Sequence, residues 1–168
     1  MLKKKLEECG AIKYGEFTLT SGKKSSYYVD IKAASTDPEV LKIIAKKMSD
    51  LVDGDKIAGM ELGAVPLAAA VSLETGKPFL MIRKKKKGHG TGGRIEGRLE
   101  KGERVTVVED VTTTGGSSVE TVNVLRDAGA LVERVLVVVD RGEGATENLK
   151  DIDVELVSLV SAEELLRG

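Results

Sequence analysis

The chain alternates between two hydrophobic patterns along nearly its whole length. Short apolar runs rich in Val and Ile, which are typical of buried strands, are separated by segments whose apolar residues recur every three or four positions, as in amphipathic helices. One helical segment begins at Asp37-Pro38, a cap followed by a proline, and places Val40, Ile44 and Met48 on one face. The pattern predicts helices at 1–9, 38–52, 65–75 and 117–128 and a short one after Ser161, and strands at 17–19, 27–31, 56–61, 78–83, 104–109, 132–139 and 154–160.

This order of elements predicts an α/β protein. The run at 132–139 is the most apolar and is typical of a central strand buried on both faces. Alternating strands and helices favour a central, mostly parallel sheet flanked by helices. The chain has 168 residues and no linker-like stretch, so we expect a single domain over 1–168. Aromatic residues make up only 3% of it, so the core must be built from aliphatic side chains.

Composition narrows the class of partner. The net charge is −1, which gives no global signal for binding nucleic acid or a membrane surface. No apolar run reaches the roughly 18 residues of a membrane span, and the Lys-rich N-terminus has no apolar signal segment. Cys9 has no second cysteine to pair with, and its spacing from Leu2 and Leu6 predicts a small core residue. We therefore expect a cytoplasmic protein.

The segment 104–118 carries the clearest chemical signal. An apolar run ends in Glu109-Asp110, a turn of Thr and Gly follows, and a helical pattern then begins. The first N–H groups of a helix lack intrahelical partners and lie at its positive end, so a helix start is suited to phosphate. Two carboxylates beside it would repel a bare phosphate but suit a sugar phosphate, whose hydroxyls they can bind. The alternative is an ordinary strand-to-helix turn of an α/β protein.

A second segment, 84–103, fits neither pattern and is expected to be a long loop. Six Lys and Arg residues and no acid lie between 83 and 94, so self-repulsion should keep the loop mobile until an anion neutralises it. The alternative is a solvated run of charge. Glycines at 88, 90 and 93 match the spacing of a dinucleotide-binding motif, which requires a strand directly before it and an apolar-faced helix after it. Here four lysines precede the glycines and no such helix follows, so we reject that interpretation. His89, the only histidine, suits hydrogen bonding to an anionic leaving group.

The segment 104–118, with its two acids followed by threonines and glycines, resembles the phosphoribosyl diphosphate (PRPP) motif of type I phosphoribosyltransferases. The segment 17–30, the pattern Arg83-Lys84-x-x-Lys87-Gly88-His89-Gly90 and Asp140-Arg141-Gly142 are similar to motifs of the orotate phosphoribosyltransferases within that family. The resemblance implies the type I phosphoribosyltransferase fold, with a small N-terminal hood at about 1–36 and a flexible catalytic loop at about 84–103. It also implies transfer of ribose 5-phosphate from PRPP to orotate, giving orotidine 5′-monophosphate and pyrophosphate.

The same resemblance assigns roles to individual positions. The residues implied in catalysis are Lys84, His89 and Asp110. Those implied in PRPP binding are Arg83, Lys84, Lys87, His89, Glu109, Asp110, Val111, Thr112, Thr113, Thr114, Gly115, Gly116 and Ser117. Those implied in orotate binding are Thr113, Arg141 and Tyr28, and Gly63 and Ala64 form a pyrophosphate loop. Mg²⁺ is the implied cofactor, bound mainly through PRPP rather than by direct protein ligands. A homodimer that shares loop residues between subunits is also implied.

Some positions depart from the family pattern or leave alternatives open. Some family members have lysines at the places of Gly63 and Thr20, so the contacts expected there are in doubt. Arg141 could form a strand-end salt bridge instead of binding a substrate, and Tyr28 could pack in the core. A phosphoribosyltransferase for a purine or uracil would have no use for the Arg141 cation. A PRPP-binding regulator would require a nucleic-acid surface or an added domain, for which charge and length give no support.

Overall fold

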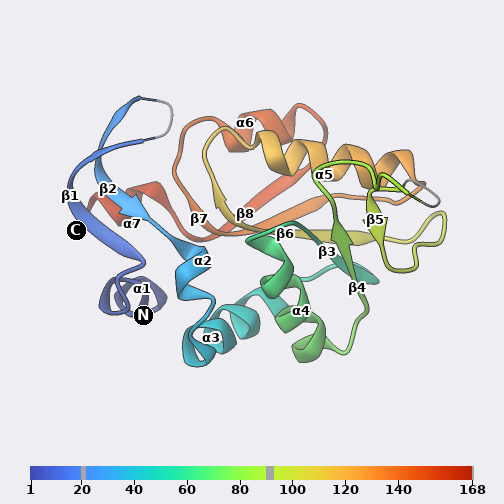
Figure 1. Ribbon diagram of the computed structural model, residues 1–168, viewed down its shortest axis with the longest axis horizontal. Helices are drawn as coiled ribbons and strands as arrows, with labels where there is room; N and C mark the ends of the chain where they lie inside the picture. Colours follow the sequence, from blue (N-terminus) through green and yellow to red (C-terminus); the bar gives the residue numbers. More distant parts are fainter. Residues whose placement is uncertain (20–21, 90–92, 168) are drawn as a thin grey trace.

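A six-stranded sheet forms the centre of the computed structural model, which describes residues 1–19, 22–89 and 93–167 (Figure 1). The strand order is β5-β4-β3-β6-β7-β8, and every neighbouring pair is parallel except β4 with β5. This confirms the predicted α/β class with a mostly parallel central sheet. The strands are β3 (Lys56–Met60), β4 (Phe79–Ile82), β5 (Ile95–Glu96), β6 (Val105–Thr112), β7 (Arg134–Asp140) and β8 (Glu155–Val160).

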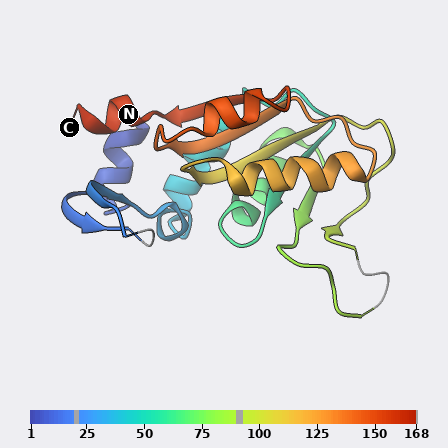
Figure 2. The same cartoon turned by 90° about the horizontal axis from the view of Figure 1, so that it is seen from above.

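Helices cover both faces of this sheet (Figure 2). One face packs against α3 (Pro38–Ser49) and α4 (Ala64–Thr75), and the other against α5 (Gly116–Asp127) and α6 (Ala145–Lys150). Successive residues of β6 point to opposite faces, so Val107 belongs to the core beneath α5 and Val108 to the core beneath α3 and α4. Both faces of β6 are therefore buried, which explains its apolar run.

A separate two-stranded sheet stands at one end of the molecule (Figure 1). Its antiparallel strands are β1 (Ile12–Thr18) and β2 (Lys24–Val29), beside the terminal helices α1 (Leu2–Glu8) and α7 (Ala162–Leu166). The short helix α2 (Ile31–Ala34) leads from this hairpin into the main body. None of the helices in the described ranges is both long and apolar enough to cross a bilayer.

Two predicted helix starts are confirmed by their hydrogen bonds. The Asp37 carboxylate accepts from the N–H groups of Glu39 at 2.8 Å and Val40 at 3.2 Å, which caps α3. Ser161 and Glu164 form a reciprocal capping box at the start of α7. In each case a short polar side chain satisfies N–H groups that the helix itself leaves free.

Several details differ from the sequence-based expectation. The strand predicted at 104–109 continues to Thr112, because its backbone stays paired with β7 as far as Asp140. Ile31, predicted to end a strand, begins α2 instead. The elements α2, β5 and α6 were missed because each is too short to display a period. The prediction of Cys9 as a core residue is wrong: it follows the last residue of α1 and is exposed.

Candidate active site

The turn from β6 into α5 forms a cradle at the carboxyl edge of the sheet. Residues Glu109 and 111–118 line a cavity of about 160 Å³ there. Gly115 has φ +82°, and a Cβ on it would lie 3.2 Å from Ala145, so this turn requires glycine. The first turn of α5 contains no acidic residue. Gly116 and Ser117, at the start of α5, line the cavity, so this is where the predicted anion site would lie.

The two acids before the cradle lie in different environments. The Glu109 side chain is buried and accepts hydrogen bonds from the Asp110 N–H at 3.3 Å and the Ser118 hydroxyl at 3.4 Å. Burial, followed by the hydrogen bond and charge of Asp110, raises the pKa of Glu109 to about 8. Burial therefore favours the protonated form of Glu109, which reduces the negative charge that the pair places beside the cradle.

Asp110 lies beside the loop after β3, within hydrogen-bonding reach of Glu109. The Val111 N–H donates to its carboxylate at 2.9 Å, and the Lys32 ammonium lies 3.6 Å from it. A Cβ on Gly63 would lie 2.2 Å from the Asp110 carboxylate and 3.0 Å from the Lys32 side chain. No side chain fits at position 63 with these neighbours in place. Ala64, the other residue predicted in the pyrophosphate loop, begins α4 and is buried.

Lys32 is a site residue that the sequence analysis missed. It belongs to no motif, and its only local signal is its position just after Asp30, whose side chain caps α2. The Lys32 side chain is 60% exposed, so its ammonium reaches solvent while it pairs with Asp110. Lys32 thus supplies a cation beside Gly63 from a different element. Thr20, the other position noted for a missing lysine, lies outside the described residues.

A larger cavity of about 420 Å³ lies between the N-terminal hairpin and the carboxyl edge of the main sheet. The three residues predicted to bind orotate, Thr113, Arg141 and Tyr28, all line it. The remaining lining residues come from β2, β6 and the neighbouring loops: Leu19, Lys23, Val29, Val111, Thr114 and Glu143. Thr113 and Thr114 belong to the lining of both this cavity and the phosphate cradle, so the two sites adjoin.

Arg141 is held in this cavity by the hairpin. Its guanidinium donates to the Ser25 hydroxyl at 3.1 Å and lies 4.4 Å from the centre of the Tyr27 ring. Its Nε–H is buried and meets no acceptor in the part of the chain that the structure describes. It also makes no salt bridge among those residues, so the strand-end alternative finds no support. A buried cationic donor without an acceptor suits an anionic ligand.

Two roles were considered for Tyr28, packing in the core and contact with the base, and its neighbour Tyr27 takes the first. Tyr27 is the buried aromatic, whereas Tyr28 is 42% exposed and packs its ring 5.7 Å from that of Phe17. Tyr28 therefore presents a face to the cavity rather than filling the core. This difference follows from strand alternation, because neighbouring residues of β2 point to opposite sides.

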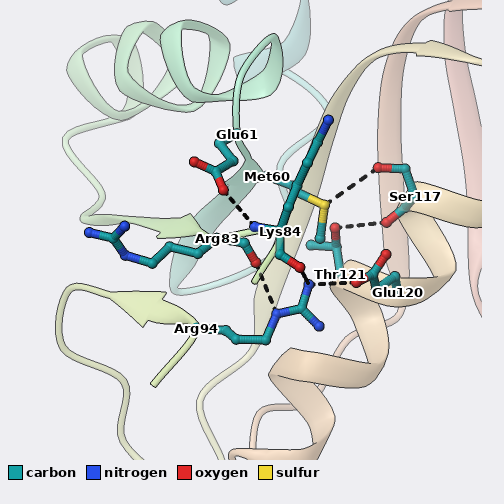
Figure 3. Close-up of polar contacts among 8 residues, drawn as sticks. All are labelled: Met60, Glu61, Arg83, Lys84, Arg94, Ser117, Glu120 and Thr121. Carbon is teal, nitrogen blue, oxygen red and sulfur yellow. Dashed lines mark hydrogen bonds and ion pairs between the residues drawn. The ribbon is translucent and has the colours of Figure 1, made fainter. Parts of the chain in front are cut away.

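The basic segment begins where β4 ends. Arg83 and Lys84 point their side chains in different directions (Figure 3). Arg83 forms an ion pair with Glu96 at 2.9 Å. Its hydrogen bond, followed by its charge and that of Lys87, lowers the pKa of Glu96. Lys87 and His89 are exposed and line neither the cradle nor the larger cavity. The chain after β4 extends away from the rest of the molecule (Figure 2).

The fold and this site define a class of protein. A family model for the phosphoribosyl transferase domain matches residues 32–163. The protein therefore belongs to the phosphoribosyltransferase family. It is 56% identical to the orotate phosphoribosyltransferase of Methanosarcina mazei, over 96% of this chain and 88% of the relative. It is 52% identical to that of Methanocaldococcus jannaschii, over 95% of this chain and 92% of the relative.

Solved structures agree with this placement. A crystal structure of orotate phosphoribosyltransferase from Aeropyrum pernix superposes with a TM-score of 0.88 at 39% identity, covering 99% of this chain and 97% of that one. The Mycobacterium tuberculosis enzyme in complex with PRPP superposes with a TM-score of 0.80 at 31% identity, covering 98% of each chain. The predicted fold family and the resemblance stated from the sequence are both confirmed.

Proposed function

We propose that this protein is an orotate phosphoribosyltransferase of pyrimidine (UMP) biosynthesis. It transfers the 5-phosphoribosyl group from PRPP to orotate, giving orotidine 5′-monophosphate and pyrophosphate. The observation that carries this proposal is Arg141, a partly buried cation that lines a cavity adjoining the cradle and whose Nε–H has no acceptor among the described residues. Orotate is a pyrimidine with a carboxylate, the group that a guanidinium binds best. Uracil and adenine are neutral and would leave this charge without a partner.

The site residues give PRPP a direction along the edge of the sheet. The cradle formed by residues 112–117 binds the 5′-phosphate, and Glu109 and Asp110 bind the ribose hydroxyls. A protonated Glu109 can both donate and accept a hydrogen bond, whereas the Asp110 carboxylate accepts. The diphosphate then lies toward the backbone of Gly63 and Ala64, with Lys84 as the nearby cation. This arrangement leaves C1′ facing the larger cavity, where the base binds.

In the reaction the bond from C1′ to the pyrophosphate oxygen breaks, and its electron pair leaves with pyrophosphate. A ring nitrogen of orotate forms the new bond to C1′, and the proton of that nitrogen passes to the leaving pyrophosphate or to water. Negative charge grows on the leaving group and positive charge on the ribose, so Lys84 stabilises the first and the Asp110 carboxylate the second. Positioning of the base between Tyr28 and Arg141 supplies the rest, and no protein nucleophile is required.

The remaining loop cations complete the diphosphate site in this proposal. Lys87 and His89 approach the pyrophosphate from the loop, where His89 hydrogen-bonds the leaving group. Arg83 also contributes, and because it is paired with Glu96 at 2.9 Å, that ion pair must open before its guanidinium reaches the substrate. The mobility predicted for the loop enters this proposal for Lys87 and His89, which the loop must deliver to the site.

Mg²⁺ enters the proposal through the substrate. In the described residues no group of three or more Asp, Glu, His or Cys side chains could hold a metal ion. Mg²⁺ prefers oxygen ligands and keeps several of its waters, so PRPP oxygens can hold it with few protein ligands. Asp110, at the edge of the cleft, is the carboxylate that would contact it. When bound, the ion neutralises part of the diphosphate charge.

Two further features support a homodimer and a cytoplasmic location in this proposal. Leu62, 73% exposed, and Met81, 40% exposed, line one cavity of about 270 Å³ with Arg83 and Glu96 at the base of the loop. A second copy of the chain that covers these apolar residues would form a homodimer in which loop residues are shared. The lone cysteine, which has no disulfide partner, fits a reducing cytoplasm.

The test is a comparison of bases. Purified protein is mixed with PRPP and Mg²⁺, and the consumption of orotate, uracil and adenine is followed in parallel. We expect turnover with orotate alone. Turnover with uracil or adenine would assign a different phosphoribosyltransferase activity. Saturable PRPP binding without consumption of any base would favour the PRPP-binding regulator.

A further inference from the structure

The peptide of Lys84 is held from both sides by charged side chains (Figure 3). Its N–H donates to the Glu61 carboxylate at 2.7 Å, and its C=O accepts from the Arg94 guanidinium at 2.8 Å. Hydrogen bonds to charged groups are shorter and stronger than neutral ones. Lys84 follows directly after β4, so these two bonds fix the point at which the basic segment leaves the sheet.

Arg94 makes this contact as part of a larger set. Its Nε–H donates to the Arg83 C=O at 2.9 Å, and its Nη2 also pairs with the Glu120 carboxylate at 2.5 Å. The Arg83 N–H in turn donates to the Arg94 C=O at 2.7 Å. The Arg94 side chain is only 19% exposed. A rigid guanidinium fork can bind two successive carbonyls and a carboxylate together, which a lysine ammonium on a flexible stem does less well.

These contacts reach α5, the helix whose first turn lines the cradle. Glu120 lies on α5 next to Thr121, whose hydroxyl donates to the Ser117 C=O at 2.9 Å. The Ser117 hydroxyl contacts the Met60 sulfur at 3.6 Å, so the first turn of α5 is tied to the end of β3 (Figure 3). Glu61 follows Met60 directly. The Lys84 peptide is therefore positioned between the helix that forms the phosphate cradle and the loop that faces the diphosphate.

We infer that Arg94 and Glu61 are positioning residues for catalysis, which act by holding Lys84 at a fixed place relative to the phosphate cradle. The inference rests on the function proposed above, in which Lys84 stabilises the leaving pyrophosphate. It divides the basic segment into two parts with different tasks. Lys84 is a fixed member of the site, whereas Lys87 and His89 lie beyond the two held residues and are not bound by this set of contacts.

The alternative is that Arg94 merely closes the β4–β5 pair. The two accounts differ in their kinetics. If Arg94 acts through Lys84, its loss lowers kcat and leaves KM for orotate unchanged, because the Lys84 charge matters most in the transition state. Loss of Arg94 also has no further effect on kcat once Lys84 is removed, since the effects of residues that act as a unit do not add. A role in stability alone would give independent, multiplicative losses.

The experiment is a double-mutant cycle with Lys84→Ala and Arg94→Ala. We expect Lys84→Ala to lower kcat well over tenfold and Arg94→Ala to lower it roughly ten- to hundredfold, because small displacements of a catalytic group are costly. The double variant should be no slower than Lys84→Ala alone. Arg98→Ala is the matched control, since Arg98 is exposed and lies in the same segment. We expect Arg98→Ala to keep wild-type kcat.

A second pair of variants keeps the test valid if Arg94→Ala folds poorly. Glu61 is exposed, so its replacement should leave the fold intact. Glu61→Ala should lower kcat several-fold, and Glu61→Gln should restore it, because an amide oxygen still accepts the Lys84 N–H. Multiplicative losses of kcat in the cycle would overturn the positioning role but not the proposed function. Equal kcat values for Glu61→Ala and wild type would do the same. Absence of orotate turnover by the wild-type protein would instead overturn the proposed function, and this inference with it.

Discussion

Replacing Glu109 by glutamine should stabilise the protein in a pH-dependent way. The folded state raises the pKa of this carboxyl from 4.5 to about 8, so the folded protein holds the Glu109 proton more tightly than the unfolded chain does. The wild-type protein therefore loses stability as pH rises from about 4.5 through about 8, and glutamine, which cannot ionise, escapes that loss. The shift corresponds to at most about 5 kcal/mol.

The measured gain should be smaller than this limit. Glu109 lines the cradle cavity of about 160 Å³, where water can reach the carboxylate once it forms. The Ser118 hydroxyl also donates a hydrogen bond to it. We therefore expect Glu109→Gln to be more stable than wild type by about 2–3 kcal/mol at pH 9, with little difference at pH 5. The assay is urea unfolding of both proteins at several pH values, with Glu74→Gln as a control for the loss of one exposed carboxylate. A difference that does not change with pH would refute the reasoning.

Two substitutions test the substrate contacts. Arg141→Ala should raise KM for orotate roughly ten- to hundredfold, the equivalent of one lost charged hydrogen bond, and should change KM for PRPP far less. Equal effects on both substrates would indicate a structural role, and Arg141→Lys, which keeps the charge but not the fork, should fall between. Gly63→Ala should raise KM for PRPP about tenfold and spare orotate, because its Cβ would lie 2.2 Å from the Asp110 carboxylate and displace it. An unchanged KM for PRPP would show that Asp110 can move without loss.

The local pattern of the sequence was sufficient for much of the fold. The parallel sheet could be predicted because strands buried on both faces, such as the run at 132–139, are continuous and apolar. Asp37 and Ser161 marked helix starts because capping depends on residues only two or three positions away. The extension of β6 past Glu109 could not be predicted this way, since it depends on pairing with β7, whose residues are distant in sequence.

The same distinction between local motifs and contacts of distant residues holds for the site. The cradle and Arg141 belong to short motifs, and the structure brings Thr113, Arg141 and Tyr28 together in one cavity. Lys32 and the Arg94 contacts were missed because each joins residues that are distant in sequence and carry no shared motif. The different environments of Glu109 and Asp110 were also not foreseen. They depend on partners that are distant in sequence, Ser118 on α5 for Glu109 and Lys32 on α2 for Asp110.

The central claim is the transfer of ribose phosphate to orotate, and its most direct test is the stoichiometry of one reaction. Orotate loss and pyrophosphate release are measured together after wild-type protein is added to PRPP, Mg²⁺ and orotate. We predict that the two are equal and that neither occurs when PRPP is left out. Pyrophosphate release without orotate loss, or PRPP binding with no change in either, would contradict the account.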